Sequence, residues 1–222
     1  MIVKIFNEPY LKRLDNIKQW QEIDVFKEES VSQHSYKVLI FGRVLLEDIF
    51  GKNNCPKVLD FKLACLDALM FHDWDEALIL RDMSHETKYN AYNGEKIREV
   101  LNDFAHHRAL EEFCEKNPID GLFTPASCMM VDNICSATSD AKLFCKLCDW
   151  LALIFYMKRE RELGNNNLYA KWEYCRQNAT KTAEKVMDVL KFRFDIPGVV
   201  LNFDELNNLI KTLWTQEDKV EK

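Results

Sequence analysis

Hydrophobic residues recur at helical spacing along most of the chain and predict a protein built from helices. Residues 8–22 carry an apolar residue at about every third position, and the stripe continues to Trp20. A second helix should follow, with Ser32 as its N-cap. Its apolar positions are Val38, Leu39, Phe41, Leu45, Leu46 and Ile49. A loop over 51–56 separates this helix from a third one, expected over residues 57–71.

The same spacing continues through the C-terminal half, where only the polar and aromatic segment 82–94 reads as irregular. Helices are predicted over 95–116, 126–136, 139–163, 168–193 and 203–216. The helix over 139–163 has the strongest apolar face, and Gly164 followed by three asparagines should end it. We therefore expect an all-α fold, one helical domain over residues 1–222, with the helices of 168–216 packing on it.

Composition agrees with a helical domain of ordinary size. The chain has 222 residues, enough for a sizeable core in one domain. Only 6 Gly and 5 Pro give few turn signals for this length, which favours long helices over many short strands. No repeat, low-complexity tract or linker divides the sequence.

The net charge argues against some kinds of binding partner, and the cysteines bear on the cellular compartment. A net charge of −6 argues against a nucleic-acid polymer or an acidic membrane as partner, because both require a basic surface. A small phosphorylated substrate remains possible, since a bound metal can reverse the local field. The N-terminal residues lack a signal-peptide pattern, so the 8 cysteines are expected to be reduced thiols in a cytoplasm.

The most distinctive polar residues follow the helix predicted over 57–71. His72 and Asp73 are adjacent, and Glu76 lies four residues beyond His72, on the same face if the segment is helical. Imidazole and carboxylate together suit a divalent ion of the Zn, Mn, Co or Fe kind. The alternative is a polar helix end that happens to contain this pair, and the stretch alone does not decide between them.

Two other polar residues lie on faces that should be buried. His34 shares its helix face with Val31, Val38 and Phe41, where a lone histidine is more often a hydrogen-bonded core residue than a ligand. Asp149 lies in the most hydrophobic helix, where aspartate is unfavourable. Pairing with Lys146, three residues earlier, is one structural explanation for Asp149.

Taken together, these residues supply two imidazoles and two carboxylates from three helices. The set is His34, His72, Asp73 and Asp149. Such a set can hold one divalent ion and leave positions open for water and substrate, as catalytic metal sites do.

At this point the sequence resembles a family. The order H…HD…D on helices is that of HD-domain metal-dependent phosphohydrolases, and the likeness is greatest to bacterial 5′-deoxynucleotidases over most of residues 8–170. The stretches that carry the resemblance are LKRLDNIKQW (11–20), SVSQHS (30–35), HDWDEALILRD with SHETKY (72–89) and KLCDWLALIFYMKRERELGNNN (146–167).

The resemblance implies a role for each candidate residue. The four residues of the set would be ligands of one divalent ion (Mn, Co, Mg, Zn or Fe), and Glu76 would be the general base that activates water. Trp20, Asp82 and Lys88 would lie near the sugar and phosphate of a deoxynucleotide. A cytoplasmic homodimer is also implied.

The sequence departs from the family pattern near the phosphate contact. Gln19 stands where the family usually has arginine, and Gln33 stands where it often has glutamate. Arg13 and Lys18 are nearby basic candidates for the phosphate contact. One residue is also inserted between Glu76 and Asp82, relative to the family pattern. These departures bear on the substrate contacts that the resemblance implies more than on the metal ligands.

Other interpretations remain beside the deoxynucleoside monophosphatase. An HD triphosphohydrolase acting on deoxynucleoside triphosphates could use the same ligands, and a catalytically silent HD domain could bind a nucleotide as a regulator. A second metal would need more histidines, of which His85, His106 and His107 are the candidates. The CxxC spacing of Cys145 and Cys148 lacks a second pair, so buried packing is expected there rather than a zinc site.

Overall fold

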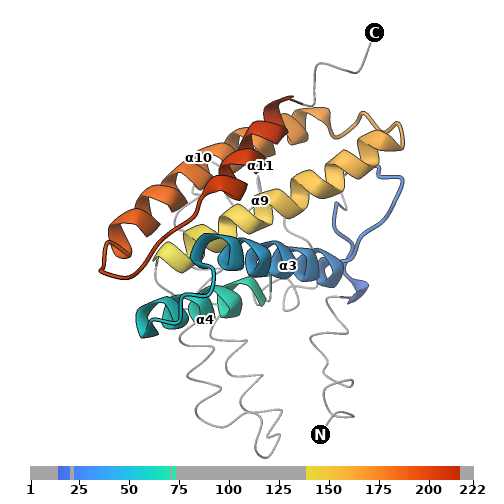
Figure 1. The fold of residues 1–222 in the computed structure, drawn as a ribbon. Coiled ribbons are helices and arrows are strands. Elements are labelled where there is room, and N and C mark those ends of the chain that lie inside the picture. The colour runs from blue at the N-terminus through green and yellow to red at the C-terminus, as the bar shows by residue number, and fades with distance from the viewer. Residues whose placement is uncertain (1–14, 21–22, 71, 74–138, 216–222) are drawn as a thin grey trace, which may run out of the picture. The chain divides into compact units, whose positions relative to one another are not determined.

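The computed structural model describes residues 15–20, 23–70, 72–73 and 139–215, and all the regular elements among them are helices (Figure 1). They are α3 (Val31–Phe50), α4 (Pro56–Met70), α9 (Ser139–Glu162), α10 (Tyr169–Arg193) and α11 (Asp204–Thr215). The all-α prediction is confirmed. The helices predicted over 57–71, 139–163, 168–193 and 203–216 match α4, α9, α10 and α11 to within one residue at each end.

The chain forms two compact units. The first comprises Met1–Ser35 and Phe71–Ser136, and the second comprises Tyr36–Met70 and Ala137–Lys222. Helix α3 therefore begins in the first unit and continues in the second. The organisation as one domain stays a prediction.

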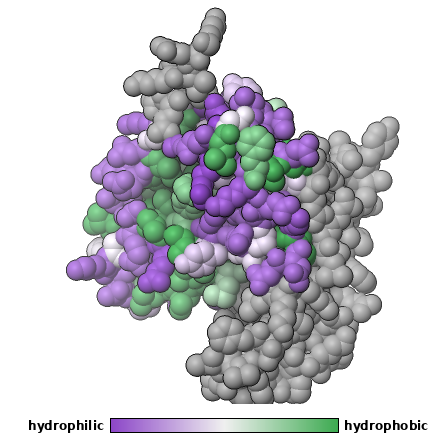
Figure 2. All heavy atoms as spheres, turned by 90° about the vertical axis from the view of Figure 1, so that its right-hand side faces the viewer, coloured by the Kyte–Doolittle hydropathy of each residue, from purple (hydrophilic) through white to green (hydrophobic). Residues whose placement is uncertain are grey.

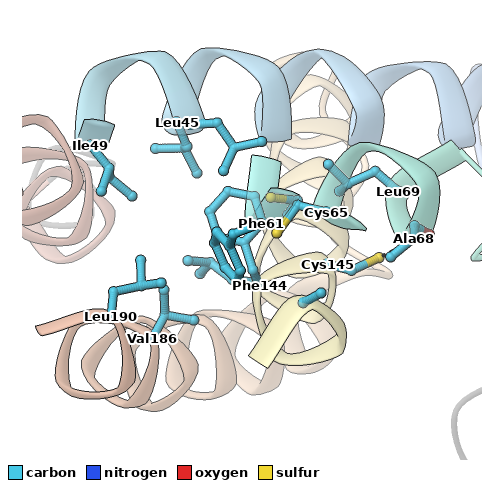
Figure 3. Packing of buried hydrophobic residues seen from close by; sticks show 14 of the residues in the cluster. Leu45, Ile49, Phe61, Cys65, Ala68, Leu69, Phe144, Cys145, Val186 and Leu190 are labelled. Atoms are coloured by element: carbon cyan, nitrogen blue, oxygen red, sulfur yellow. Dashed lines mark hydrogen bonds between the residues drawn. The ribbon is translucent and has the colours of Figure 1, made fainter. Parts of the chain in front are cut away.

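The hydrophobic core of the second unit lies between α3, α4, α9 and α10 (Figure 3). Phe61 of α4 and Phe144 of α9 are fully buried and occupy the middle of this core. Phe194, after the end of α10, packs edge-on against Phe61, with ring centroids 5.4 Å apart. Removal of this apolar surface from contact with water is the main stabilising contribution to such a core.

A close approach inside the second unit holds α3 against α4. Gly42 of α3 faces Leu69 near the end of α4, and a Cβ atom at position 42 would lie 2.1 Å from Leu69 Cδ1. A side chain at position 42 would therefore require the Leu69 side chain to move. This contact lies in the last turn of α4.

The turn between α9 and α10 confirms the stop that the sequence predicts. Gly164 has φ +92°, a conformation that glycine adopts without strain. The Asn165 backbone N–H donates to the Glu160 carbonyl at 3.0 Å, and the Asn165 side-chain amide donates to the Glu160 carboxylate at 2.7 Å. Both side chains are buried, and each supplies the other's polar contact.

Helix α11 is docked on α10 by a buried arginine. The Arg176 guanidinium donates to the Leu213 carbonyl at 3.0 Å and to the Glu173 carboxylate at 2.9 Å. Its Cζ atom lies 4.2 Å from the centre of the Trp214 ring. One side chain of α10 thus binds both the last turn of α11 and an aromatic residue on it.

The surface of the described residues mixes hydrophilic and hydrophobic side chains on the face drawn in Figure 2. Among the helices described, none combines the length and the hydrophobicity needed to span a membrane. On α9, Phe155 is 43% exposed, whereas its neighbours Ile154 and Tyr156 are buried.

Candidate metal centre

The segment that leads into α3 is held by backbone pairing. Lys18 and Ser30 form an isolated antiparallel bridge. The Gln19 N–H donates to the Glu29 carbonyl at 2.7 Å, and the Val31 N–H donates to the Ile17 carbonyl at 2.9 Å. The helix predicted over 8–22 is therefore wrong for residues 17–20, because these backbone groups pair with residues 29–31 instead of along a helix.

Ser30, and not Ser32, is the N-cap of α3. The Gln33 N–H donates to Ser30 Oγ at 3.3 Å, and the Ser30 N–H donates to Gln33 Oε1 at 3.1 Å. This reciprocal pair is a capping box. The Ser32 hydroxyl instead donates to the Asp15 carboxylate and contacts the Ser30 hydroxyl. The N-cap prediction for Ser32 is wrong, and Gln33 acquires a structural role.

The capped first turn positions His34, which is buried and only 1% exposed. In the same unit, the chain beyond the end of α4 supplies His72 and Asp73. The ring centroids of the two histidines are 5.6 Å apart, and one potential ligand nitrogen of each lies within 4.8 Å of the other. Asp73 Oδ2 lies 2.9 Å from His72 Nε2 and 4.0 Å from His34 Nε2.

The three side chains form what we call the histidine–aspartate group: His34, His72 and Asp73. Asp73 is 8% exposed, so its carboxylate is nearly removed from water and needs a cationic or hydrogen-bonding partner. Two imidazoles and one carboxylate are suitable ligands for a divalent transition metal. The chemical types of these side chains and their closeness therefore fit a metal ion. Such an arrangement is more typical of a histidine that binds metal than of an isolated core histidine, the alternative for His34.

Asp149, the fourth predicted ligand, lies on α9 in the second unit. Its Oδ2 atom is 2.5 Å from Lys146 Nζ, and its side chain is 14% exposed. The pairing with Lys146 that the sequence suggests is thus present. The role of Asp149 as a metal ligand stays a prediction.

Trp20 and Gln19 have unusual local environments. Trp20 is 9% exposed and has φ +67°, a left-handed conformation that is strained for a bulky residue. Strained residues of this kind cluster at functional sites. The Gln19 side-chain oxygen is buried and accepts no hydrogen bond within the part of the chain described. Lys18 pairs with Glu28 at 2.6 Å on the surface. The substrate contacts predicted for Trp20 and Gln19 stay predictions.

Several predicted site residues lie outside the described residues. They are Arg13, Glu76, Asp82 and Lys88, together with the second-metal candidates His85, His106 and His107. Their predicted roles are unchanged.

The cysteines of α9 are packing residues. Cys145 and Cys148 are both buried, and the Cys145 thiol donates to the Ala68 carbonyl at 3.5 Å. Burial raises the pKa of Cys148 well above its ordinary value, and burial raises the pKa of Cys175 on α10 to about 12. The burial of both side chains and the contact of Cys145 with Ala68 agree with the packing role expected for the CxxC pair.

Glu29 is a buried ionisable residue that the sequence pattern does not single out. Glu29 is 4% exposed and lies next to the N-cap of α3, where its carbonyl accepts the Gln19 N–H. The run Lys27-Glu28-Glu29 reads as a solvated connection, and nothing in it distinguishes the buried glutamate from the exposed one.

Comparison with solved structures identifies the class of fold. An HD-domain phosphohydrolase from Listeria innocua is 18% identical, with a TM-score of 0.55 over 95% of this chain and 98% of that chain. A conserved hypothetical protein from Pyrococcus furiosus is 22% identical, with a TM-score of 0.51 over 83% of this chain and 99% of that chain. The fold is that of HD-domain phosphohydrolases.

The sequence gives the more specific assignment. Residues 8–194 match the family described as 5′-deoxynucleotidase YfbR-like, and the chain belongs to this family. No curated protein sequence gives a match. The resemblance stated from the motifs is confirmed, and the protein is a metal-dependent phosphohydrolase.

Proposed function

We propose that this protein removes the 5′-phosphate from deoxynucleoside monophosphates with the help of one divalent metal ion. The observation that carries the proposal is the histidine–aspartate group, in which two imidazoles and a buried carboxylate converge. Family membership over residues 8–194 supports the choice of a nucleotide as substrate.

The proposed ligands are the three members of this group and Asp149. A bound divalent ion would supply positive charge to the phosphate and lower the pKa of a water molecule. Glu76 is proposed as the general base that accepts the proton of the attacking water. Asp73 and the two imidazoles lie close together, as the ligands of one ion must.

The proposed substrate contacts divide by the chemistry of their side chains. Lys88 and Arg13 are cationic and suit the phosphate as charge partners. Asp82 and the Gln19 side-chain oxygen are hydrogen-bond acceptors, so they suit a sugar hydroxyl or a base N–H. Trp20 offers an aromatic face to the nucleoside. A buried acceptor such as Gln19 Oε1 gains most from a ligand that donates to it.

The same family resemblance supports a single-domain chain that forms a homodimer in the cytoplasm. A dimer would show twice the chain mass of 26.2 kDa by light scattering at working concentration. A monomer at all concentrations would refute the dimer without affecting the proposed reaction.

The deciding experiment is orthophosphate release from panels of deoxynucleoside monophosphates, ribonucleoside monophosphates and deoxynucleoside triphosphates. Metal-stripped protein is supplied in turn with Mn, Co, Mg, Zn or Fe(II). We expect release from the deoxynucleoside monophosphates and a reduction of 10²-fold or more in Glu76→Gln, the size typical of a lost general base.

The controls separate the proposal from its alternatives. Glu28→Gln, at the exposed surface pair with Lys18, should keep the wild-type rate. Chromatography of the products covers the triphosphates, since a triphosphohydrolase releases tripolyphosphate and no orthophosphate. Deoxynucleoside and tripolyphosphate formed from the triphosphates alone would replace the proposal by the triphosphohydrolase. Metal binding without turnover of any nucleotide would indicate the regulatory HD domain.

A further inference from the structure

The Lys146–Asp149 pair has an unusual position for an ion pair on one helix. Lys146 Nζ lies 2.5 Å from Asp149 Oδ2 on α9. The side chain of Asp149 is only 14% exposed, whereas that of Lys146 is 36% exposed. The pair therefore lies partly inside the protein, where charges interact more strongly than on the open surface.

The ammonium group is held from a second side. Lys146 Nζ lies 4.3 Å from the centre of the Trp150 ring, close enough for a cation–π interaction. Trp150 is buried and packs edge-on against Tyr174 of α10, with ring centroids 5.9 Å apart. The cation is thus fixed between a carboxylate and an aromatic ring that is itself immobilised.

Asp149 needs a cation when no metal is bound. Aspartate is unfavourable in the interior of a helix, and a carboxylate removed from water is costly unless a positive charge compensates it. The Lys146 ammonium provides this charge from the same helix. A divalent ion bound to Asp149 would provide it as well, so the two cations have the same partner.

We propose that Lys146 is an internal counter-cation of Asp149 that competes with the divalent metal for this carboxylate. Lys146 stabilises the metal-free protein and weakens metal binding, which keeps the ion exchangeable. The inference rests on the proposed function, in which Asp149 is a metal ligand. Two like charges beside one carboxylate repel each other, and the repulsion grows as their separation falls.

Replacement of Lys146 by methionine removes the charge and keeps most of the apolar stem. Lys146→Met should bind Mn at least tenfold more tightly than wild type and should melt at a lower temperature when metal-free. Lys146→Arg keeps the charge and should resemble wild type in both measurements. Lys158→Met, at an exposed lysine of the same helix, is the matched control and should change neither.

The test is isothermal titration of metal-stripped, full-length protein with Mn, combined with melting curves of the metal-free variants. Unchanged or weaker binding by Lys146→Met would overturn the proposal, and weaker binding would assign Lys146 the opposite role of orienting Asp149. The melting curve of each variant shows directly whether it is folded.

Asp149→Asn separates this inference from the proposed function. If Asp149→Asn binds Mn as tightly as wild type, Asp149 is not a ligand, and both the ligand assignment and the counter-cation role fail. If Asp149→Asn binds weakly and Lys146→Met does not bind more tightly, the counter-cation role alone is wrong. Weak binding by Asp149→Asn with tight binding by Lys146→Met supports both.

Discussion

Two polar side chains decide where α3 begins and therefore where His34 lies. Ser30 and Gln33 satisfy each other's backbone N–H groups, which would otherwise lack helical partners. The glutamine at position 33, a departure from the glutamate often found in the family, keeps the function of a capping box because its amide oxygen also accepts. His34 follows directly and is buried.

Ser30→Ala should destabilise the protein by about 1 kcal/mol, because the first turn of α3 loses its side-chain acceptor. Urea denaturation followed by circular dichroism measures the change as a lower midpoint with an unchanged slope. Gln33→Glu is the matched control, since glutamate also accepts from the Ser30 N–H and should leave the midpoint close to wild type. Equal midpoints for Ser30→Ala and wild type would mean that the cap contributes nothing to stability.

At the scale of elements, α11 shows how a short helix is attached to a longer one. It lies at Asp204–Thr215, beyond the matched family range that ends at residue 194, whereas Arg176 lies within that range. The buried guanidinium of Arg176 contacts a carbonyl, a carboxylate and an aromatic ring at once. Trp214 adds a hydrogen bond of 3.0 Å from its indole N–H to Thr180 Oγ1.

Arg176→Met should release α11 from α10 and cost about 2 kcal/mol, the size of a lost hydrogen bond from a charged donor. Hydrogen exchange read by mass spectrometry should show faster exchange in peptides from 204–215 than in wild type, with little change in peptides from the middle of α9. Lys181→Met, at an exposed position of α10, should exchange as wild type does. If peptides from α11 keep wild-type protection in Arg176→Met, the docking does not depend on this residue.

At the scale of the whole molecule, a metal site built from distant segments links ion binding to folding. The histidine–aspartate group takes His34 from α3 and the other two members from the chain after α4. These segments come together only when the protein is folded, so the unfolded chain lacks the site. A metal ion that binds only the folded state raises the free energy of unfolding. Well above the dissociation constant, this free energy rises linearly with the logarithm of the free metal concentration.

Removal of metal should therefore lower the melting temperature. At a free ion concentration of about 100 times the dissociation constant, the ion adds about 2.7 kcal/mol. For a chain of this length that corresponds to a rise of roughly 5–11 °C in the melting temperature. Scanning fluorimetry with and without Mn after chelation measures the rise, and His72→Ala should abolish it. An equal rise in His72→Ala would place the stabilising ion elsewhere.

The helices α4, α9, α10 and α11 follow from the sequence because their signals are local. Apolar spacing and Gly164 after α9 act within one or two turns. The pairing of Lys146 with Asp149 also follows from a local signal in the sequence, since residues three apart share a helix face. The helix predicted over 8–22 is wrong for residues 17–20, because Lys18 pairs with Ser30, twelve positions away, and no local pattern records that bridge.

The sequence of this protein specifies its helical class, its family and the residue types from which a metal site can be made. Tertiary packing alone decides which of those residues meet. His34 lies 38 positions before His72, and their rings come within 5.6 Å because the segments fold together. Tertiary contacts likewise bury Glu29 and leave its neighbour Glu28 exposed. Helix periodicity depends on neighbours along the chain, whereas burial and ligand geometry depend on residues that only folding brings near.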